Sequence, residues 1–259
     1  MRVYRLACIA VLLVGALGVA ASLGLLTRAG RALVVRTWFR VLLRASGVRL
    51  VIRGGPDGTW RDGALIAANH VSWLDIPAVL AIEPVRVLAK SDVREWPVIG
   101  VLASRAGAVF IDRRRLRGLP VTVAKIAATL RGGQNVLVFP EGSTWCGRTQ
   151  GKFYPATFQS AIDADVAVRP LALRYLLPDG TPTSVAAFVG DDTLLASVWR
   201  VVATRGLIVE VELGPALPTT DQTRRTLAAA SRSWTISAFT GARAVQDREE
   251  ARGGERVHA

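Results

Sequence analysis

The stretch Asn69-His70-Val71-Ser72-Trp73-Leu74-Asp75 joins two apolar segments of the chain. The segment before it, residues 64–68, is uniformly apolar and predicts a buried strand. The segment after it, residues 76–81, is apolar and predicts the start of a helix. A polar loop between a strand and a helix is a common position for chemistry, because the two elements hold it rigid. The fold is therefore expected to form around this unit, with functional residues in its loop.

His70 is the stronger candidate of only two histidines in the chain, because the other, His258, lies in the polar tail. If the protein uses an imidazole base near neutral pH, His70 is expected to supply it. Asp75 is close enough in sequence to accept a hydrogen bond from the ring, which fixes its tautomer and favours the imidazolium. The alternative is a structural histidine beside an aspartate that caps a helix.

Two further apolar segments end in polar clusters. Residues 107–114 run from an apolar strand into charged side chains, and residues 136–138 predict a strand that leads into the polar loop at 139–144. Strands that alternate with helical segments indicate an α/β domain with a mixed, largely parallel sheet flanked by helices. In open sheets of this kind, sites lie at the carboxyl ends of the strands, so the three polar clusters are expected to lie near one another.

Taken in order, these blocks resemble those of the membrane-associated glycerolipid acyltransferases, in particular the bacterial 1-acyl-glycerol-3-phosphate acyltransferases. His70 and Asp75 match that family's His-x-x-x-x-Asp block. The other three blocks are matched at residues 107–113 (Gly-x-x-Phe-Ile-Asp-Arg), 139–143 (Phe-Pro-Glu-Gly-Thr/Ser) and, loosely, 166–171. One departure stands out: the family often has arginine after the third block, where this chain has Thr144.

The resemblance implies transfer of an acyl chain from acyl-CoA or acyl carrier protein to the sn-2 hydroxyl of 1-acyl-glycerol-3-phosphate. The product, phosphatidic acid, serves phospholipid biosynthesis. His70 is then the general base and Asp75 its orienting partner, because a hydroxyl is a poor nucleophile until its proton is removed. Backbone amides near His70 or Gly142 are expected to stabilise the oxyanion. Transfer is expected to be direct, since nothing near Cys146 in sequence predicts a lowered thiol pKa.

Acceptor recognition is expected from residues at the ends of the second and third blocks. Arginine binds phosphate bidentately, so Arg113 is the first candidate for the acceptor phosphate and Arg114 the second. The resemblance places Glu141 in the same region, where a carboxylate is suited to glycerol hydroxyls or a neighbouring arginine rather than phosphate. The remaining candidates for substrate binding are Gly142, Ser143, Lys90 and Arg148, the last as a replacement for the cation missing at Thr144.

The charge of the whole chain favours an anionic partner. Its 259 residues carry a net charge of +13, nearly all of it from arginine, which suits an anionic membrane surface or a phosphorylated lipid. No nucleic-acid motif is present, so nucleic-acid binding is not expected. A single usable histidine and scattered carboxylates predict no metal site. Neither Gly-x-Gly-x-x-Gly nor a P-loop occurs, so no nucleotide cofactor is indicated beyond the acyl donor itself.

The first part of the chain predicts membrane attachment. Residues 6–26 are apolar over a length that suits a spanning helix, with a secretory signal peptide as the alternative. More arginines follow this segment than precede it, which places the following domain on the cytoplasmic side of the cell membrane. Residues 28–46 predict a second helix with arginines at helical spacing. That helix is expected to lie on the membrane, to pack on the domain, or to do both.

These features divide the chain into three parts. Residues 1–46 are the membrane anchor and amphipathic helix, residues 47–240 the acyltransferase domain, and residues 241–259 a charged tail expected to be disordered. Three other functions stay open. The first is an acyltransferase for another lysolipid, such as lyso-ornithine lipid or a lysophospholipid. The second is a secreted serine hydrolase, although the chain has no Gly-x-Ser-x-Gly elbow. The third is a basic, non-enzymatic protein of the membrane surface.

Overall fold

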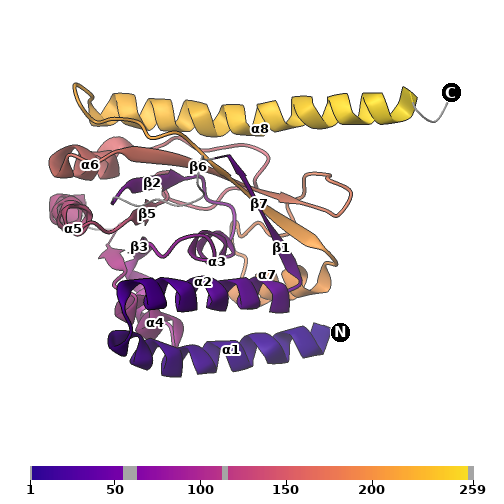
Figure 1. The fold of residues 1–259 in the computed structure, drawn as a ribbon, viewed down its shortest axis with the longest axis horizontal. Coiled ribbons are helices and arrows are strands. Elements are labelled where there is room, and N and C mark those ends of the chain that lie inside the picture. Colours follow the sequence, from indigo (N-terminus) through magenta and orange to yellow (C-terminus); the bar gives the residue numbers. More distant parts are fainter. Residues whose placement is uncertain (1, 55–62, 113–115, 256–259) are drawn as a thin grey trace.

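The computed structural model describes residues 2–54, 63–112 and 116–255, which form one sheet with helices on both faces (Figure 1). Its seven strands are β1 (Val48–Gly54), β2 (Leu65–Ala68), β3 (Arg86–Lys90), β4 (Val109–Ile111), β5 (Val136–Val138), β6 (Val168–Leu176) and β7 (Leu207–Leu213). Their order across the sheet is β1-β7-β6-β2-β5-β3-β4. Every neighbouring pair is parallel except β6 and β7. The predicted α/β fold with a mixed, largely parallel sheet is confirmed.

Strand β2 lies at the centre of the sheet and leads directly into the histidine loop. It pairs in parallel with β5 on one side and β6 on the other, and all four of its residues are buried. A parallel strand covered on both faces has no solvent side, which explains why its sequence is apolar without alternation. Because the neighbours are parallel, the loops after β2 and β5 leave the sheet at the same edge.

Helices form a layer on each face of the sheet. They are α1 (Arg2–Ser22), α2 (Arg28–Ala45), α3 (Asp75–Leu80), α4 (Ile99–Arg105), α5 (Leu119–Arg131), α6 (Gln159–Ala164), α7 (Leu194–Ala203) and α8 (Arg224–Glu255). Successive residues of β2 face opposite layers: Ile66 packs with residues of α2, α3 and α7, whereas Leu65 packs with residues of α5, α6 and α8. The core is therefore two apolar clusters separated by the sheet.

Helices α1 and α2 form a hairpin that packs against the domain. Thr27 caps α2 by accepting a hydrogen bond from the Gly30 amide, and Arg36 of α2 forms an ion pair with Glu83. Ile9 of α1 packs with Leu42 of α2 and with α7. The predicted second helix is confirmed, and it packs on the domain. Among the described residues, one helix, α1, is long and apolar enough to cross a membrane, over Arg2–Ala21.

Helix α8 is longer than the sequence predicts. The closing helix was expected to end near residue 240, before a disordered tail, but α8 runs to Glu255. The tail was assigned as disordered because it has few apolar residues to pack. However, alanine, arginine, glutamate and glutamine have high intrinsic helix propensity, so a helix already started can continue through such a segment without a packing partner.

Candidate active site

Asp75 is held at the first residue of α3 with its carboxylate turned back onto the loop that precedes it. Its Oδ2 accepts hydrogen bonds from the Val71 amide at 2.7 Å and the Ser72 amide at 2.8 Å. The same oxygen lies 2.8 Å from His70 Nδ1. The predicted hydrogen bond between His70 and Asp75 is confirmed. One carboxylate oxygen thus binds two amides of the loop and the His70 ring, so Asp75 fixes the conformation of the loop and the orientation of the imidazole together.

Tyr175 completes the surroundings of Asp75. The Tyr175 hydroxyl donates to Asp75 Oδ1 at 2.6 Å, and both side chains are buried. Burial raises the pKa of the Tyr175 hydroxyl well above its usual value, and the Asp75 charge raises it further, so this hydroxyl stays a donor. Both oxygens of Asp75 therefore have donors. The sequence analysis missed Tyr175. Its one signal in the sequence is a hydroxyl-bearing aromatic residue within a largely apolar strand, β6.

The geometry fixes the state of the His70 ring. With Asp75 as the acceptor, Nδ1 carries the proton of the neutral imidazole, and Nε2 is the basic nitrogen. In the described part of the chain no side chain or backbone group hydrogen-bonds to Nε2, and the His70 side chain is 19% exposed. Phe139 stacks on the ring with centroids 3.9 Å apart and planes 15° from parallel. The imidazole is thus oriented from one edge and one face, and its basic nitrogen is free for a substrate.

Glu141 connects the loop after β5 to the histidine loop. Its Oε2 accepts from the His70 amide at 2.6 Å, and its Oε1 accepts from the Gly151 amide at 2.7 Å. It is 4% exposed, and burial raises the pKa of its carboxyl although the two amides act in the opposite direction. Glycerol hydroxyls or an arginine were the expected partners of Glu141. Within the described residues, its partners are instead backbone amides, so it positions the His70 backbone.

Two of the amides in the region expected to stabilise an oxyanion have acceptors within the protein. The His70 amide donates to Glu141, and the Gly142 amide donates to the Phe139 carbonyl at 3.1 Å. Gly142 has φ +76°, a left-handed conformation that favours glycine and lets the chain turn sharply after Glu141. These two acceptors could not be predicted from sequence proximity to His70, and stabilisation of an oxyanion by amides near His70 or Gly142 stays a prediction.

The loop after Glu141 lies over the histidine loop. The Trp145 amide donates to the His70 carbonyl at 2.8 Å, and the Thr144 hydroxyl donates to the Phe188 carbonyl. Thr144, which stands where the resembling family often has arginine, is therefore a structural tether here. Ser143 and Arg148, both predicted to bind substrate, are exposed on this loop, beside the site.

The cationic candidates lie on neighbouring strands. Lys90 ends β3 and forms an ion pair with Asp92 at 2.5 Å, with its side chain 45% exposed. β3 and β4 are parallel to β5, so Lys90 and Asp112 leave the sheet at the same edge as Glu141. Arg113 and Arg114, the first candidates for a phosphate, lie outside the described residues.

Cys146 differs from the sequence expectation. The amides of Arg148 and Thr149 lower the pKa of its thiol, because they form hydrogen bonds that favour the thiolate. The sequence predicted no such effect, since backbone amides that point at a side chain leave no trace in residue identity.

A histidine held by a buried aspartate, at the carboxyl end of a central parallel strand, is an arrangement from which an imidazole can act as a base. Known proteins specify the class further. The sequence profile of the Acyltransferase family matches residues 45–174. The chain belongs to this family and is an acyltransferase.

Two relatives and one solved structure show where the similarity extends. The chain is 40% identical over 159 residues to the 1-acyl-sn-glycerol-3-phosphate acyltransferase of Neisseria gonorrhoeae, covering 61% of this chain and 62% of that protein. The match thus spans less than two thirds of that relative. The chain is also 36% identical over 195 residues to the lyso-ornithine lipid O-acyltransferase of Pseudomonas aeruginosa, covering 75% of this chain and 74% of that protein. The crystal structure of the 1-acyl-sn-glycerophosphate acyltransferase PlsC of Thermotoga maritima is similar with a TM-score of 0.67, covering 92% and 94% at 18% identity. That likeness confirms the fold.

Proposed function

We propose that this acyltransferase moves an acyl chain from acyl-CoA or acyl carrier protein to the sn-2 hydroxyl of 1-acyl-glycerol-3-phosphate, giving phosphatidic acid. The observation that carries the proposal is the His70–Asp75 pair, in which Nδ1 is tied to a buried carboxylate and Nε2 has no partner in the described part of the chain. The two relatives reported above carry the names of lysolipid acyltransferases, which supports a lipid alcohol as the acceptor.

The proposed transfer needs one proton shuttle and no covalent enzyme intermediate. His70 Nε2 removes the proton of the acceptor hydroxyl as its oxygen attacks the thioester carbonyl. The resulting imidazolium lies against the Asp75 carboxylate, which stabilises it. The tetrahedral intermediate then expels the thiolate, which takes the proton from His70, so an ester and a free thiol leave and the imidazole is neutral again. General-base catalysis of this kind contributes about 10²–10⁴-fold to the rate.

The acceptor phosphate is proposed to bind at the same edge of the sheet. Lys90 ends β3 at this edge, and the proposed phosphate contacts of Arg113 and Arg114 come from the segment that follows β4 in the sequence. Gly142 and Ser143 border the His70 loop, and Arg148 is exposed on the loop that the Trp145 amide ties to His70. Together they would hold a phosphate near the basic nitrogen.

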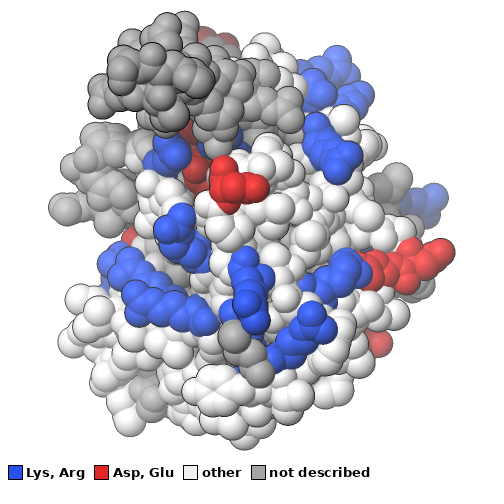
Figure 2. Space-filling model, turned by 90° about the vertical axis from the view of Figure 1, so that its right-hand side faces the viewer, with Lys and Arg blue, Asp and Glu red and all other residues white. Residues whose placement is uncertain are grey.

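The proposal includes placement at the cytoplasmic face of the cell membrane. One side of α1 packs on α2 and α7, and the other exposes apolar side chains: Val3, Tyr4, Val11 and Val14. Figure 2 shows uncharged side chains at the base of the molecule, where α1 lies in Figure 1, and a band of Lys and Arg above it. An apolar base below a cationic band suits insertion into one leaflet, with the cations among anionic headgroups.

The decisive experiment uses the purified full-length protein with labelled acyl-CoA or acyl carrier protein. The acceptors are 1-acyl-glycerol-3-phosphate, lyso-ornithine lipid and lysophosphatidylcholine. We expect transfer to 1-acyl-glycerol-3-phosphate. Turnover should fall by about 10²-fold or more in His70→Ala and should not change in His258→Ala, the matched control. A fully active His70→Ala variant would contradict the general base. Absence of transfer to every lysolipid would contradict the proposed function.

A second candidate acceptor is lyso-ornithine lipid, which has no phosphate. Thr144 in place of the family's arginine favours it, because one expected phosphate contact is missing and the threonine is instead tied to Phe188. The relative from Pseudomonas aeruginosa carries the corresponding name. Faster turnover of lyso-ornithine lipid than of 1-acyl-glycerol-3-phosphate in the same panel would select it.

A further inference from the structure

A groove lies between the end of α2 and the start of β1, away from the histidine loop. Its volume is about 480 Å³, and its lining residues are Arg40, Leu43, Arg44, Gly47, Val48, Arg49, Leu50 and Ile52. β1 is an edge strand, and two strands, β7 and β6, separate it from β2, which positions His70. The groove is therefore distinct from the candidate active site.

The rim of the groove is cationic. Arg40, Arg44 and Arg49 are all exposed. Arg40 Nε donates to the Ala81 carbonyl at 3.0 Å, a neutral acceptor that leaves its charge uncompensated. In the parts of the chain that the structure describes, Arg44 and Arg49 have no acidic partner. Arg40 and Arg44 lie one turn apart on the same side of α2. Two guanidinium groups without carboxylates favour an anion, and arginine is suited to the tetrahedral oxygens of a phosphate.

The floor of the groove is apolar. Val48, Leu50 and Ile52 alternate along β1, so they share one face of the strand. Leu43 and Val48 are buried at 1% and 3% exposure, whereas Ile52 is 42% exposed. A free phosphate would gain nothing from this floor, but an acyl chain laid along it would remove Ile52 from water. The lining thus fits a molecule with an anionic head and an apolar tail.

The groove lies next to the proposed membrane-inserted helix. The Arg5 side chain of α1 packs directly on Gly47, where an added Cβ would lie 2.3 Å from the guanidinium carbon, and it donates to the Val202 carbonyl at 2.8 Å. Packed helices lie about 8–10 Å apart, so the groove is one helix layer above α1. If α1 inserts its apolar face at the headgroup–acyl boundary, the groove is at the height of the lipid phosphates.

We propose that this groove binds one anionic phospholipid, with its phosphate between Arg40 and Arg44 and one acyl chain along Leu50 and Ile52. The site is non-catalytic and holds the α2–β1 corner to the membrane. The inference rests on the membrane placement given under the proposed function. It does not depend on acyl transfer, so binding and turnover are measured separately.

Native mass spectrometry tests the site on the full-length protein, purified in detergent and supplied with phosphatidylglycerol or phosphatidylcholine. We expect one retained phosphatidylglycerol and no retained phosphatidylcholine. Arg40→Gln with Arg44→Gln should weaken retention by about ten-fold or more, since each removes a charged hydrogen-bond donor. Arg224→Gln with Arg225→Gln removes the same charge from exposed positions on α8 and should have no effect.

A second variant separates a built site from diffuse attraction of a cationic surface. Ile52→Ser keeps every charge but removes apolar area from the floor, so it should also weaken phosphatidylglycerol retention. Unchanged retention in Ile52→Ser, or equal losses in the two arginine pairs, would overturn the site in favour of general electrostatic attraction. Equal displacement of the lipid by inorganic phosphate would overturn the role of the acyl chain, and retention of an acidic peptide instead would identify a protein surface. Thermal melts confirm that each variant is folded.

Discussion

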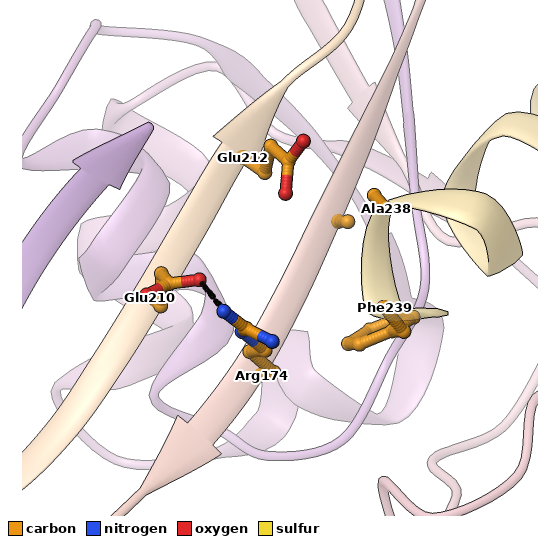
Figure 3. Close-up of a pocket in the computed structure, with 6 residues that line it drawn as sticks. Arg174, Glu210, Glu212, Ala238 and Phe239 are labelled. Atoms are coloured by element: carbon orange, nitrogen blue, oxygen red, sulfur yellow. Dashed lines mark hydrogen bonds and ion pairs between the residues drawn. The ribbon is translucent and has the colours of Figure 1, made fainter. Parts of the chain in front are cut away.

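Asp75 and Glu210 are both buried carboxylates, at 0% and 2% exposure, yet their partners differ in kind. Asp75 accepts from two backbone amides, the Tyr175 hydroxyl and a histidine that is neutral before it takes a proton. Glu210 lies between two arginines on the other face of the molecule, as Figure 3 shows for Arg174. Arg53 Nε donates to its Oε2 at 2.7 Å, and Arg174 Nε donates to its Oε1 at 2.6 Å.

The difference supports the proposal that Asp75, and not Glu210, takes part in catalysis. The charge of Glu210 is compensated permanently by guanidinium groups, so it is available to no other cation. The charge of Asp75 is solvated by dipoles alone, and the cation that can form beside it is the imidazolium of His70. In the proposed mechanism, Asp75 stabilises a charge that exists only during the transfer, which is the condition for accelerating a reaction rather than tightening a resting structure.

Asp75→Asn should break the catalytic member of this pair. The asparagine amide has no negative charge to stabilise the imidazolium. Its NH₂ group can also donate to Nδ1, which favours the tautomer with the proton on Nε2, so kcat should fall by about 10²–10⁴-fold. Initial rates with saturating acceptor measure the effect. The matched control is the same carboxylate-to-amide change at Glu210. An Asp75→Asn enzyme within a few-fold of the wild type would sink the assignment, because about ten-fold is the least that a lost charge partner should cost.

Glu210→Gln should lower stability instead of turnover. It leaves Arg174, which is 11% exposed, without its counter-charge, and breaking a buried pair costs about 3–5 kcal/mol. The midpoint of thermal unfolding should fall by roughly 10 °C in a domain of this size. At a temperature where the variant is folded, kcat should be that of the wild type. A folded Glu210→Gln enzyme with reduced kcat would show that this ion pair reaches the active site, contrary to the comparison.

Tyr175→Phe sharpens the comparison by removing one dipole from Asp75. We expect kcat to fall by about ten-fold with little change in KM, since a hydrogen bond to a charged group is worth about 1.5–3 kcal/mol. The loss should appear in kcat and not in KM, because Tyr175 contacts Asp75 and not the substrate. Tyr4→Phe, on the exposed side of α1, is the control. A lower melting temperature with unchanged kcat would make Tyr175 a packing residue only.

Glu212→Gln tests the smallest effect. Burial raises the pKa of the Glu212 carboxyl; Arg174 opposes this, and Glu210 adds to it. The folded state thus binds this proton more tightly than the unfolded chain, so the contribution is present at acidic pH and is lost as the pH rises through the folded pKa. Glutamine avoids that loss. The variant should match the wild type at pH about 4 and exceed it at pH about 7 by no more than about 0.5 kcal/mol, because solvent screens this partly exposed group. A variant that melts lower at neutral pH would mean that Glu212 contributes a net favourable ion pair.

The sequence predicts the site where its parts are local and misses it where they are distant. His70 and Asp75 share one loop, so their hydrogen bond follows from spacing. Tyr175 lies 100 residues further along the chain, and only the pairing of β6 beside β2 brings it to Asp75. The amide partners of Glu141 were likewise beyond prediction, since they depend on how two loops cross. Apolar strands fixed the fold reliably because burial on both faces leaves a simple pattern.

The pairing of β1 with β7 has a consequence for how the protein is made. β1 follows the α1–α2 hairpin directly, but its partner is the last strand of the sheet. Contacts between residues far apart in sequence close late, because the entropy of joining them must be offset first. On the ribosome the helical hairpin emerges first and can fold through local contacts, while β1 waits for β7. The hairpin can therefore form early, while this edge of the sheet is completed only after β7 has been made.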